Sequence, residues 1–416
     1  MLANQENTNL KKRFFWRAIP LLIVCFFILL FYSGLPSGSL NFSQAYFNTT
    51  YGWSLTSITL PVTIGAFIAI PATFLLGTFI FKIGATKVLV PALLVVGVCQ
   101  FLVGYATNLA ILSIGLFFTK VLCVALLLAV LTYCTNWFAE WRGRVLGLVT
   151  IGPPFSAAIG VPLQNFGIES IGFPKTNAVI GIIVVALGII ASFVCRTTPE
   201  ELGLYPDGKA SKPEMIEDDI SDIKTKWTPK KIFSNRQSWI IIIGFGFFIF
   251  IIEGIMPNFI IRMTDIGLDM KTTLSLFTAA ALAGIALSYF YGWIDDKFGM
   301  PIASTILGIV YILGLTCLLF AAPTNMALLI GGTAGIASII GGTPNLAPSS
   351  IAYVFGRRSF THINRYLQMG QYVIPAFTLT FMGVIHDITG SFDLALKIMI
   401  GLSAVATILV SRIRKV

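Results

Sequence analysis

Twelve apolar stretches separated by short polar breaks dominate this sequence, and each is roughly as long as the 20 residues that a helix needs to cross a bilayer. Hydrophobic residues make up 56% of the 416 positions and charged residues only 11%, which is too apolar for a water-soluble domain. We therefore predict an all-α membrane protein with 12 transmembrane helices. We expect these helices at about residues 17–40, 55–81, 88–106, 110–137, 145–166, 177–195, 239–261, 272–293, 303–321, 326–353, 367–385 and 394–410.

Two loops of the sequence resemble each other and indicate that the chain is duplicated. The segments GTFIFKIGATK (residues 77–87) and GWIDDKFGMPI (residues 292–302) share three residues at a constant separation of 215 positions. The shared pairs are Gly77 and Gly292, Lys82 and Lys297, and Gly84 and Gly299, and the loop residues Arg142 and Arg357 are also 215 positions apart. We predict an N-terminal six-helix bundle over residues 1–195, a cytoplasmic linker over 196–236 and a C-terminal six-helix bundle over 237–416.

The distribution of Lys and Arg predicts the orientation of the helices. The formal net charge is +10, but the basic residues lie in short loops and no motif that reads nucleic acid surrounds them. If both termini lie inside, 23 of the 28 Lys and Arg residues fall on the inner side, and Lys120 lies within a helix. The four on the outer side are Lys175, Arg262, Lys271 and Lys397. Since positively charged loops stay cytoplasmic, we expect a multi-pass protein of the cell membrane with both termini in the cytoplasm.

Several chemical functions find no support in the sequence. The six cysteines lie within or at the ends of apolar stretches, without a CxxC pair, which is typical of packing residues rather than of disulfides or metal ligands. The chain has no P-loop, no GxSxG and no HExxH motif. We therefore expect neither an enzyme nor ATP-driven transport, and neither a cofactor nor a metal.

The turn Gly-x-x-x-Asp-Lys-x-Gly at residues 292–299 resembles the loop between helices 2 and 3, and again between helices 8 and 9, of the major facilitator superfamily. The resemblance covers the whole chain and implies two six-helix bundles related by a pseudo-two-fold axis. It also implies gating roles for both copies of the turn, in which Asp296 and Lys297 help to hold cytoplasmic helix ends together, and for Arg142 and Arg357. In the first copy Phe81 replaces the acidic residue, so we expect gating to depend mainly on the second copy.

A glycine followed by prolines in the fifth expected helix resembles a motif found on that helix in many antiporters of the family. The residues are Gly152 and Pro153, followed by a second proline. Because proline removes a backbone donor and glycine lets another helix approach, the segment predicts a hinge. A static kink is the alternative, since other expected helices also carry proline.

Two ionisable residues lie deep within expected helices. Lys120 is roughly 15 Å from the outer end of the fourth helix and Glu253 roughly 20 Å from the inner end of the seventh, so both are near the middle of the bilayer. An isolated charge there costs several kcal/mol, so each must face a water-filled cavity or a partner. Our hypothesis is that Lys120 pairs with an anionic substrate and that Glu253 takes up a proton. The alternatives are that the two neutralise one another or that Lys120 extends along lipid.

The first and seventh expected helices are interrupted at similar places, at Gly34 and Pro36 and at Gly254 and Pro257. Broken helices at matching positions of two repeats predict a binding site. Tyr32, Asn345 and Gln371 are candidate cargo contacts, although such polar residues also commonly join helices.

Within the superfamily, the segment TTPEELGLYPDG at residues 197–208 resembles the oxalate/formate antiporter and monocarboxylate-porter-like group. This resemblance implies a secondary active transporter of a small organic anion, coupled to a proton or to a counter-anion. We expect a monocarboxylate as the substrate, a monomer in the lipid bilayer, and no nucleic-acid partner. Proton-coupled efflux of amphipathic or cationic compounds is one alternative, and a non-transporting membrane sensor is another.

Overall fold

The structure, a computed structural model, describes residues 2–138, 151–209, 227–356 and 360–415, together with Val145, Leu148 and Val149. All regular secondary structure in these residues is helical, which confirms the predicted fold class. Eleven helices within the described ranges are long and apolar enough to span a membrane. The twelfth expected helix, over residues 145–166, lies partly outside the described residues, and its described part continues as helix as far as Ile171.

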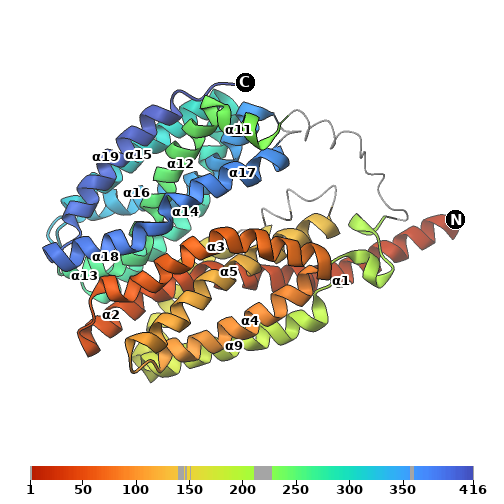
Figure 1. Ribbon diagram of the computed structural model, residues 1–416, viewed down its shortest axis with the longest axis horizontal. Helices are drawn as coiled ribbons and strands as arrows, with labels where there is room; N and C mark the ends of the chain where they lie inside the picture. The colour runs from red at the N-terminus through yellow and green to blue at the C-terminus, as the bar shows by residue number, and fades with distance from the viewer. Residues whose placement is uncertain are drawn as a thin grey trace. The chain divides into compact units, whose positions relative to one another are not determined.

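The chain divides into two compact units, which we describe separately. Unit 1 comprises Met1–Ser39, Ile64–Ser156 and Leu163–Met215. Its helical elements are α1 (Leu2–Ser33), η1 (Gly34–Gly38), most of α3 (Leu55–Ile83), α4 (Ala85–Gly104), α5 (Leu109–Trp137), α7 (Gly152–Phe155), most of α8 (Val161–Ile171), α9 (Phe173–Val194), η3 (Pro199–Leu202) and η4 (Pro206–Gly208). Within this unit α4 packs between α5 and α9 (Figure 1).

Unit 2 comprises Leu40–Thr63, Ala157–Pro162 and Ile216–Val416. It contains most of α2 (Ser39–Tyr51), the first turns of α3, most of η2 (Ser156–Gly160), α11 (Pro229–Ser234), α12 (Arg236–Ile255), η5 (Met256–Asn258), α13 (Phe259–Asp265), α14 (Met270–Phe298), α15 (Met300–Leu319), α16 (Met326–Phe355), α17 (Phe360–Val373), η6 (Pro375–Phe377), α18 (Thr378–Thr389) and α19 (Asp393–Val410). Residues 40–63, from the first half of the sequence, thus pack with the second half. Figure 1 shows α13 and α18 at one end of this unit and α11 at the other.

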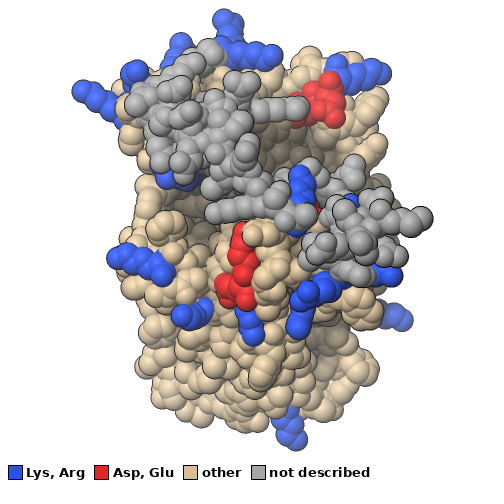
Figure 2. Space-filling model, turned by 90° about the vertical axis from the view of Figure 1, so that its right-hand side faces the viewer, with Lys and Arg blue, Asp and Glu red and all other residues tan. Residues whose placement is uncertain are grey.

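Lys and Arg side chains gather on one face of the molecule. Figure 2 shows a face on which Lys and Arg predominate over Asp and Glu. In each unit we call the end that carries the turn after α3 or α14 the charge-rich end. The opposite end, which we call the charge-poor end because few Lys and Arg residues lie there, carries the loop at residues 105–108 in unit 1 and the loops at 52–54, 266–269, 320–325 and 390–392 in unit 2.

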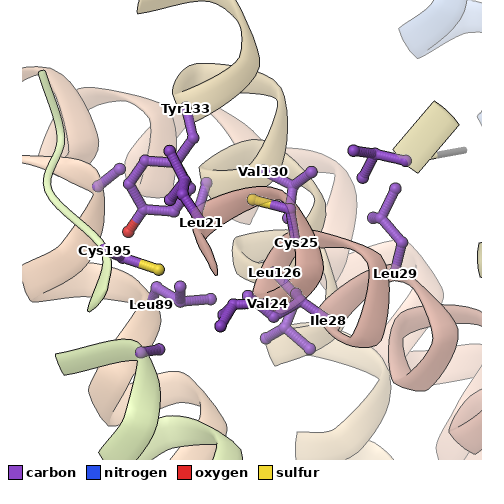
Figure 3. Close-up of a cluster of buried hydrophobic side chains, with 14 of the residues drawn as sticks. Leu21, Val24, Cys25, Ile28, Leu29, Leu89, Leu126, Val130, Tyr133 and Cys195 are labelled. Atoms are coloured by element: carbon purple, nitrogen blue, oxygen red, sulfur yellow. The ribbon is translucent and has the colours of Figure 1, made fainter. Parts of the chain in front are cut away.

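One face of α1 supplies much of the core of unit 1. Its buried residues recur every three or four positions, which places them on one side of a helix: Phe14, Ala18, Leu21, Cys25 and Ile28, each at most 1% exposed. They pack with Leu89 of α4 and with Leu126 and Val130 of α5 (Figure 3). The opposite face carries Trp16 and Ile19, which are 80% and 53% exposed. Such apolar exposed side chains fit a helix that faces lipid.

Four of the expected membrane-spanning helices are interrupted rather than continuous. The first contains the π-helical segment η1, and the fifth contains the π-helical segment η2. The seventh and eleventh contain the 3-10 turns η5 and η6. In a duplicated six-helix unit the first helix corresponds to the seventh and the fifth to the eleventh, so the interruptions occur in matching pairs.

The two copies of the glycine turn have the same backbone conformation. Gly84 has φ 95° and ψ 152°, and Gly299 has φ 89° and ψ 156°. Each ends a helix by donating its N–H to a carbonyl four residues earlier, on Ile80 and Asp295, at 2.9 Å in both cases. Only glycine adopts these φ and ψ angles without strain, which explains why both copies of the turn have glycine at this position.

We expect Gly299→Ala to destabilise the protein by about 1–3 kcal/mol, because alanine is strained at this φ. Thermal unfolding of the purified protein in detergent measures this loss. The matched control is Gly77→Ala, since Gly77 is helical and a Cβ there meets nothing within 4 Å. Equal melting temperatures for the two variants would contradict the assigned role of the turn.

Candidate functional site

Lys120 lies in the middle of α5, where its side chain is partly buried. Gly65 of α3 faces it within unit 1: a Cβ added at Gly65 would lie 3.1 Å from the Cβ and 3.4 Å from the Cγ of Lys120. The stem of Lys120 therefore occupies space that a larger residue at position 65 would fill. Cys123 lies near it, three residues further along α5.

Two further predicted residues of unit 1 lie on or against α1. Tyr32 is in the last turn of α1, before η1, and is partly buried against the core of the unit. Gly152 begins α7, and a Cβ added there would lie 2.9 Å from the carbonyl oxygen of Phe26 and 3.1 Å from the backbone nitrogen of Leu30. Pro153 follows it in the same short helix. The glycine–proline motif thus contacts α1, and its role as a hinge remains a prediction.

Glu253 is the third residue from the end of α12, directly before the interruption at η5, and its side chain is partly buried. Tyr372 of α17 lies near it. The neighbouring Gln371 is 2% exposed, and its Nε2 lies 3.5 Å from the carbonyl oxygen of Ile241 on α12. Glu253 and Gln371 are thus both residues of unit 2, whereas Lys120 is a residue of unit 1.

Amide side chains of α2 bind backbone groups at the interruption after α12. Asn41 donates from Nδ2 to the carbonyl of Met256 at 3.1 Å and accepts from the N–H of Ile260 at 3.3 Å. Gln44 donates from Nε2 to the carbonyl of Pro257 at 3.2 Å. Both amide residues are completely buried. The sequence predicts the interruption through its proline, but it contains no pattern that identifies Asn41 and Gln44 as partners.

Asn345 joins helices of unit 2. Its Nδ2 donates to the carbonyl oxygen of Ser288 on α14 at 2.7 Å, and a Cβ added at Gly292 would lie 3.2 Å from the same nitrogen. In the same helix Thr343 is hydrogen-bonded to the hydroxyl of Tyr311 on α15. One donor of Asn345 therefore stabilises the packing of α14 on α16.

At the charge-rich end of unit 2, Asp296 and Lys297 are both exposed. The Nζ of Lys297 lies 4.9 Å from the ring centroid of Trp293, a cation–π distance. The preceding carboxylate, Asp295, accepts a hydrogen bond from the hydroxyl of Ser349 on α16. Of the two consecutive carboxylates, Asp295 makes this contact between helices, and the predicted role of Asp296 in gating remains a prediction.

The corresponding turn of unit 1 carries no acidic side chain. Phe81, which occupies the acidic position, is 92% exposed, and Lys82 beside it is also exposed. The predicted gating residues Arg142 and Arg357 lie outside the described residues.

The first part of the predicted linker packs on unit 1. The hydroxyl of Tyr133 donates to Thr86, and Thr86 donates to the carbonyl of Cys195, at 3.0 Å and 3.3 Å. The indole of Trp137 donates to the carbonyl of Arg196 at 2.9 Å. Burial raises the pKa of the Cys195 thiol to about 12, although the charge of Arg196 partly opposes this shift. The thiol therefore stays protonated and unreactive at neutral pH.

The charge-poor end of unit 2 holds a polar seam between α3 and α18. Asp387 accepts from the N–H groups of Leu55 and Thr56 at 3.0 Å and 2.9 Å, one bond to each carboxylate oxygen. Further along the same helices, the hydroxyl of Thr380 donates to that of Thr63 at 2.8 Å. We call these residues the α3–α18 seam. Sequence reasoning missed it, because each of its residues is an isolated polar position in an apolar helix.

A histidine–carboxylate contact and an ion pair lie near the seam. The Nε2 of His386 is 3.1 Å from a carboxylate oxygen of Asp265, which joins α18 to α13. Arg262 of α13 lies 2.8 Å from a carboxylate oxygen of Asp393, at the start of α19. Arg262 is only 8% exposed and also donates to the carbonyl of Leu318 at 3.3 Å, so it connects α13 with α15 and the start of α19.

Comparison with known proteins yields one family and several solved structures. The sequence profile of the Major Facilitator Superfamily matches residues 22–361. A D-xylose-proton symporter has a similar structure, with TM-score 0.70, 12% identity, and coverage of 95% of this chain and 98% of that chain. None of the curated proteins compared with the chain matches it.

A bacterial homologue of the human lysosomal transporter Spinster is similar in two inward-facing states. Its unoccupied state gives TM-score 0.68 at 14% identity, covering 95% of this chain and 94% of that chain. Its occupied state gives TM-score 0.69 at 14% identity, covering 95% and 97%. Identities this low show that the fold is shared, and they say nothing about the cargo.

Proposed function

Since this chain belongs to the Major Facilitator Superfamily, we propose that it is a secondary active transporter that moves a small organic anion by alternating access. We propose a monocarboxylate as the cargo, coupled to protons or to the exchange of another anion. The segment Thr197–Gly208 supports a place near the oxalate/formate antiporter and monocarboxylate-porter-like group. A dicarboxylate is disfavoured, because the eighth expected helix has no Arg and the eleventh no Lys with which to bind a second carboxylate.

The observation that carries this proposal is the position of Lys120. Among Lys, Arg, Asp and Glu it is the one residue of the long helix α5, near its middle, and its stem fits against Gly65. A charge at that depth is costly unless it serves a partner, and an ammonium group binds a carboxylate by a charge-assisted hydrogen bond. Lys120 is therefore our proposed binding group for the anion, with Tyr32, Asn345 and Gln371 as further candidate contacts.

Glu253 is the proposed site of proton coupling. Ionisable residues inside a membrane commonly mark proton pathways. Its position close before η5 supports a role in a helix that changes shape during transport. The gating role of the glycine turns, of Arg142 and Arg357 and of the Gly152–Pro153 motif belongs to the same proposal.

The orientation that we propose places the charge-rich end in the cytoplasm and the charge-poor end outside. The tally of Lys and Arg along the sequence supports it, and the basic face in Figure 2 is consistent with it. The proposed partners are the anionic substrate, a proton or counter-anion and the lipid bilayer, with the protein as a monomer.

Export of an amphipathic cation is the second candidate, and the surroundings of Glu253 favour it. Phe250 lies one turn before Glu253 on α12, and its ring centroid is 5.4 Å from those of both Phe377 and Phe381. Aromatic faces beside a carboxylate suit a lipophilic cation. Extrusion of a fluorescent lipophilic cation from proteoliposomes, without uptake of carboxylates, would favour this function over the first.

Proteoliposome uptake of labelled monocarboxylates, with and without an inward proton gradient, tests the proposal. We expect uptake that the gradient accelerates, and we expect Glu253→Gln to remove that acceleration while anion exchange continues. Glu169→Gln is the matched control, because Glu169 is hydrogen-bonded to Asn165 at 2.7 Å near the end of α8. If parent protein and both variants take up no carboxylate under either condition, the anion proposal is wrong.

A further inference from the structure

We propose that Asp387 locks the charge-poor side of the transport path shut by holding the first turn of α3, and that its release opens that side. This inference rests on the proposed alternating access and on the proposed orientation. It assigns a positioning role to a residue that the substrate does not touch.

Asp387 binds backbone N–H groups in the first turn of α3 that the local sequence leaves without a cap. The hydroxyl of Ser54 accepts from the N–H of Ser57 at 3.2 Å, so the sequence supplies a local cap for that group. The N–H groups of Leu55 and Thr56 are bound by Asp387, which lies more than 330 positions away in the sequence. A carboxylate at a helix N-terminus is favoured both by these donors and by the helix dipole. Asp387 therefore caps the N-terminus of α3, a helix from the first half of the sequence.

Thr59 and Gly383 extend the α3–α18 seam, whose residues recur at helical spacing on both helices. Thr56, Thr59 and Thr63 lie on one face of α3, and Thr380, Gly383 and Asp387 lie on one face of α18. Thr380 binds Thr63, and a Cβ added at Gly383 would lie 2.9 Å from the backbone nitrogen of Thr56 and 3.0 Å from the hydroxyl of Thr59. The two helices thus run antiparallel in close contact, with Asp387 at the charge-poor end.

Other contacts at this end also join residues 40–63 to the second half of the chain. Asn41 and Gln44 bind the backbone at the interruption after α12, and His386, which precedes Asp387, pairs with Asp265 of α13. Alternating access separates the two halves of the chain on one side at a time, so contacts between them on that side must break when it opens. Among the described residues of the seam, Asp387 is the only one with an acidic or basic side chain. Its contact with α3 is therefore the one that a change of charge can weaken.

The strength of the lock is limited because Asp387 is itself exposed to water. An exposed helix cap contributes less than a buried ion pair, and salt screens it. Removal of the carboxylate should therefore shift the equilibrium toward the open state by roughly 3- to 30-fold, rather than abolish the closed state.

Cysteine labelling measures this shift without any substrate. Thr59→Cys serves as the reporter, because Thr59 is completely buried beneath Gly383. Cys317→Ser removes the one native cysteine that is not buried. In right-side-out vesicles, we expect Asp387→Ala to raise the rate of labelling by a membrane-impermeant maleimide roughly 3- to 30-fold, and Asp387→Asn to raise it less. High salt should speed labelling of the parent more than labelling of either variant.

Asp269→Ala is the matched control. Asp269 caps α14 by accepting from the N–H of Thr272 at 2.9 Å, at the same end of unit 2, a bond within the second half of the sequence. Labelling unchanged in both Asp387 variants, with the reporter still reactive in detergent-unfolded protein, would overturn the inference, as would an equal increase in Asp269→Ala. If labelling responds as expected but no carboxylate is taken up, the role of Asp387 is supported and the proposed monocarboxylate cargo is wrong.

Discussion

Replacement of Lys120 by alanine is expected to lower carboxylate uptake by at least about 30-fold, because truncating one partner of a buried charge pair costs roughly 2–5 kcal/mol. The substrate carboxylate would then enter the site without its charged partner. Lys120→Arg, which keeps a cation but changes its shape and donors, should retain part of the activity. Initial uptake rates over a range of substrate concentrations separate a loss of affinity from a loss of turnover.

Lys175→Ala provides the control for Lys120. Lys175 is an exposed basic residue near the start of α9, outside the middle of the helix. We expect that variant to transport like the parent protein. Parent-like uptake by Lys120→Ala would show that Lys120 merely extends along lipid or pairs within the protein, and the anion proposal would lose the observation on which it depends.

A disulfide across the α3–α18 seam is expected to stop transport almost completely and reversibly. The hydroxyl oxygens of Thr63 and Thr380 are 2.8 Å apart, so cysteines at both positions can approach the S–S distance of about 2.05 Å. If the seam must separate in each cycle, Thr63→Cys with Thr380→Cys in the Cys317→Ser background should lose more than roughly 90% of its uptake on oxidation. A reducing agent should restore it, because breaking the bond frees the helices.

Each single cysteine variant, oxidised in parallel, controls for the effect of the substitution alone. Mass spectrometry of the oxidised protein establishes that the bond has formed. A fully cross-linked protein that still transports at the rate of its reduced form would mean that α3 and α18 stay together throughout the cycle. The seam would then be structural, and Asp387 could not act as a lock.

Much of the fold follows from the sequence because the bilayer restricts the possible structures. Backbone polar groups in hydrocarbon must bond within their own segment, so long apolar stretches become helices. The positions of proline predict the interruptions at η1 and η5, and the repeated glycines predict turns with a conformation that only glycine tolerates. The family resemblance drawn from the turn at residues 292–299 is confirmed by the match over residues 22–361.

The candidate site followed from the sequence only where a charge lies in an apolar stretch. Lys120 and Glu253 are conspicuous for that reason, and the structure adds Gly65 and Tyr372 as their neighbours. Asn345 and Gln371 are equally visible as polar residues, but their amides lie at helix–helix contacts. Their proposed contact with cargo remains a prediction.

The sequence by itself determined that this chain spans a membrane as helices, that it is duplicated, and where its backbone must turn or break. The tertiary structure alone decided which polar side chains meet, as Asp387 meets Leu55 and Asn41 meets Met256. The physical reason is that a membrane helix is apolar both toward lipid and toward its neighbours, so no hydrophobic stripe marks its packing face. Partners hundreds of residues apart are set by how far one helix slides and turns against another, and only packing fixes that register.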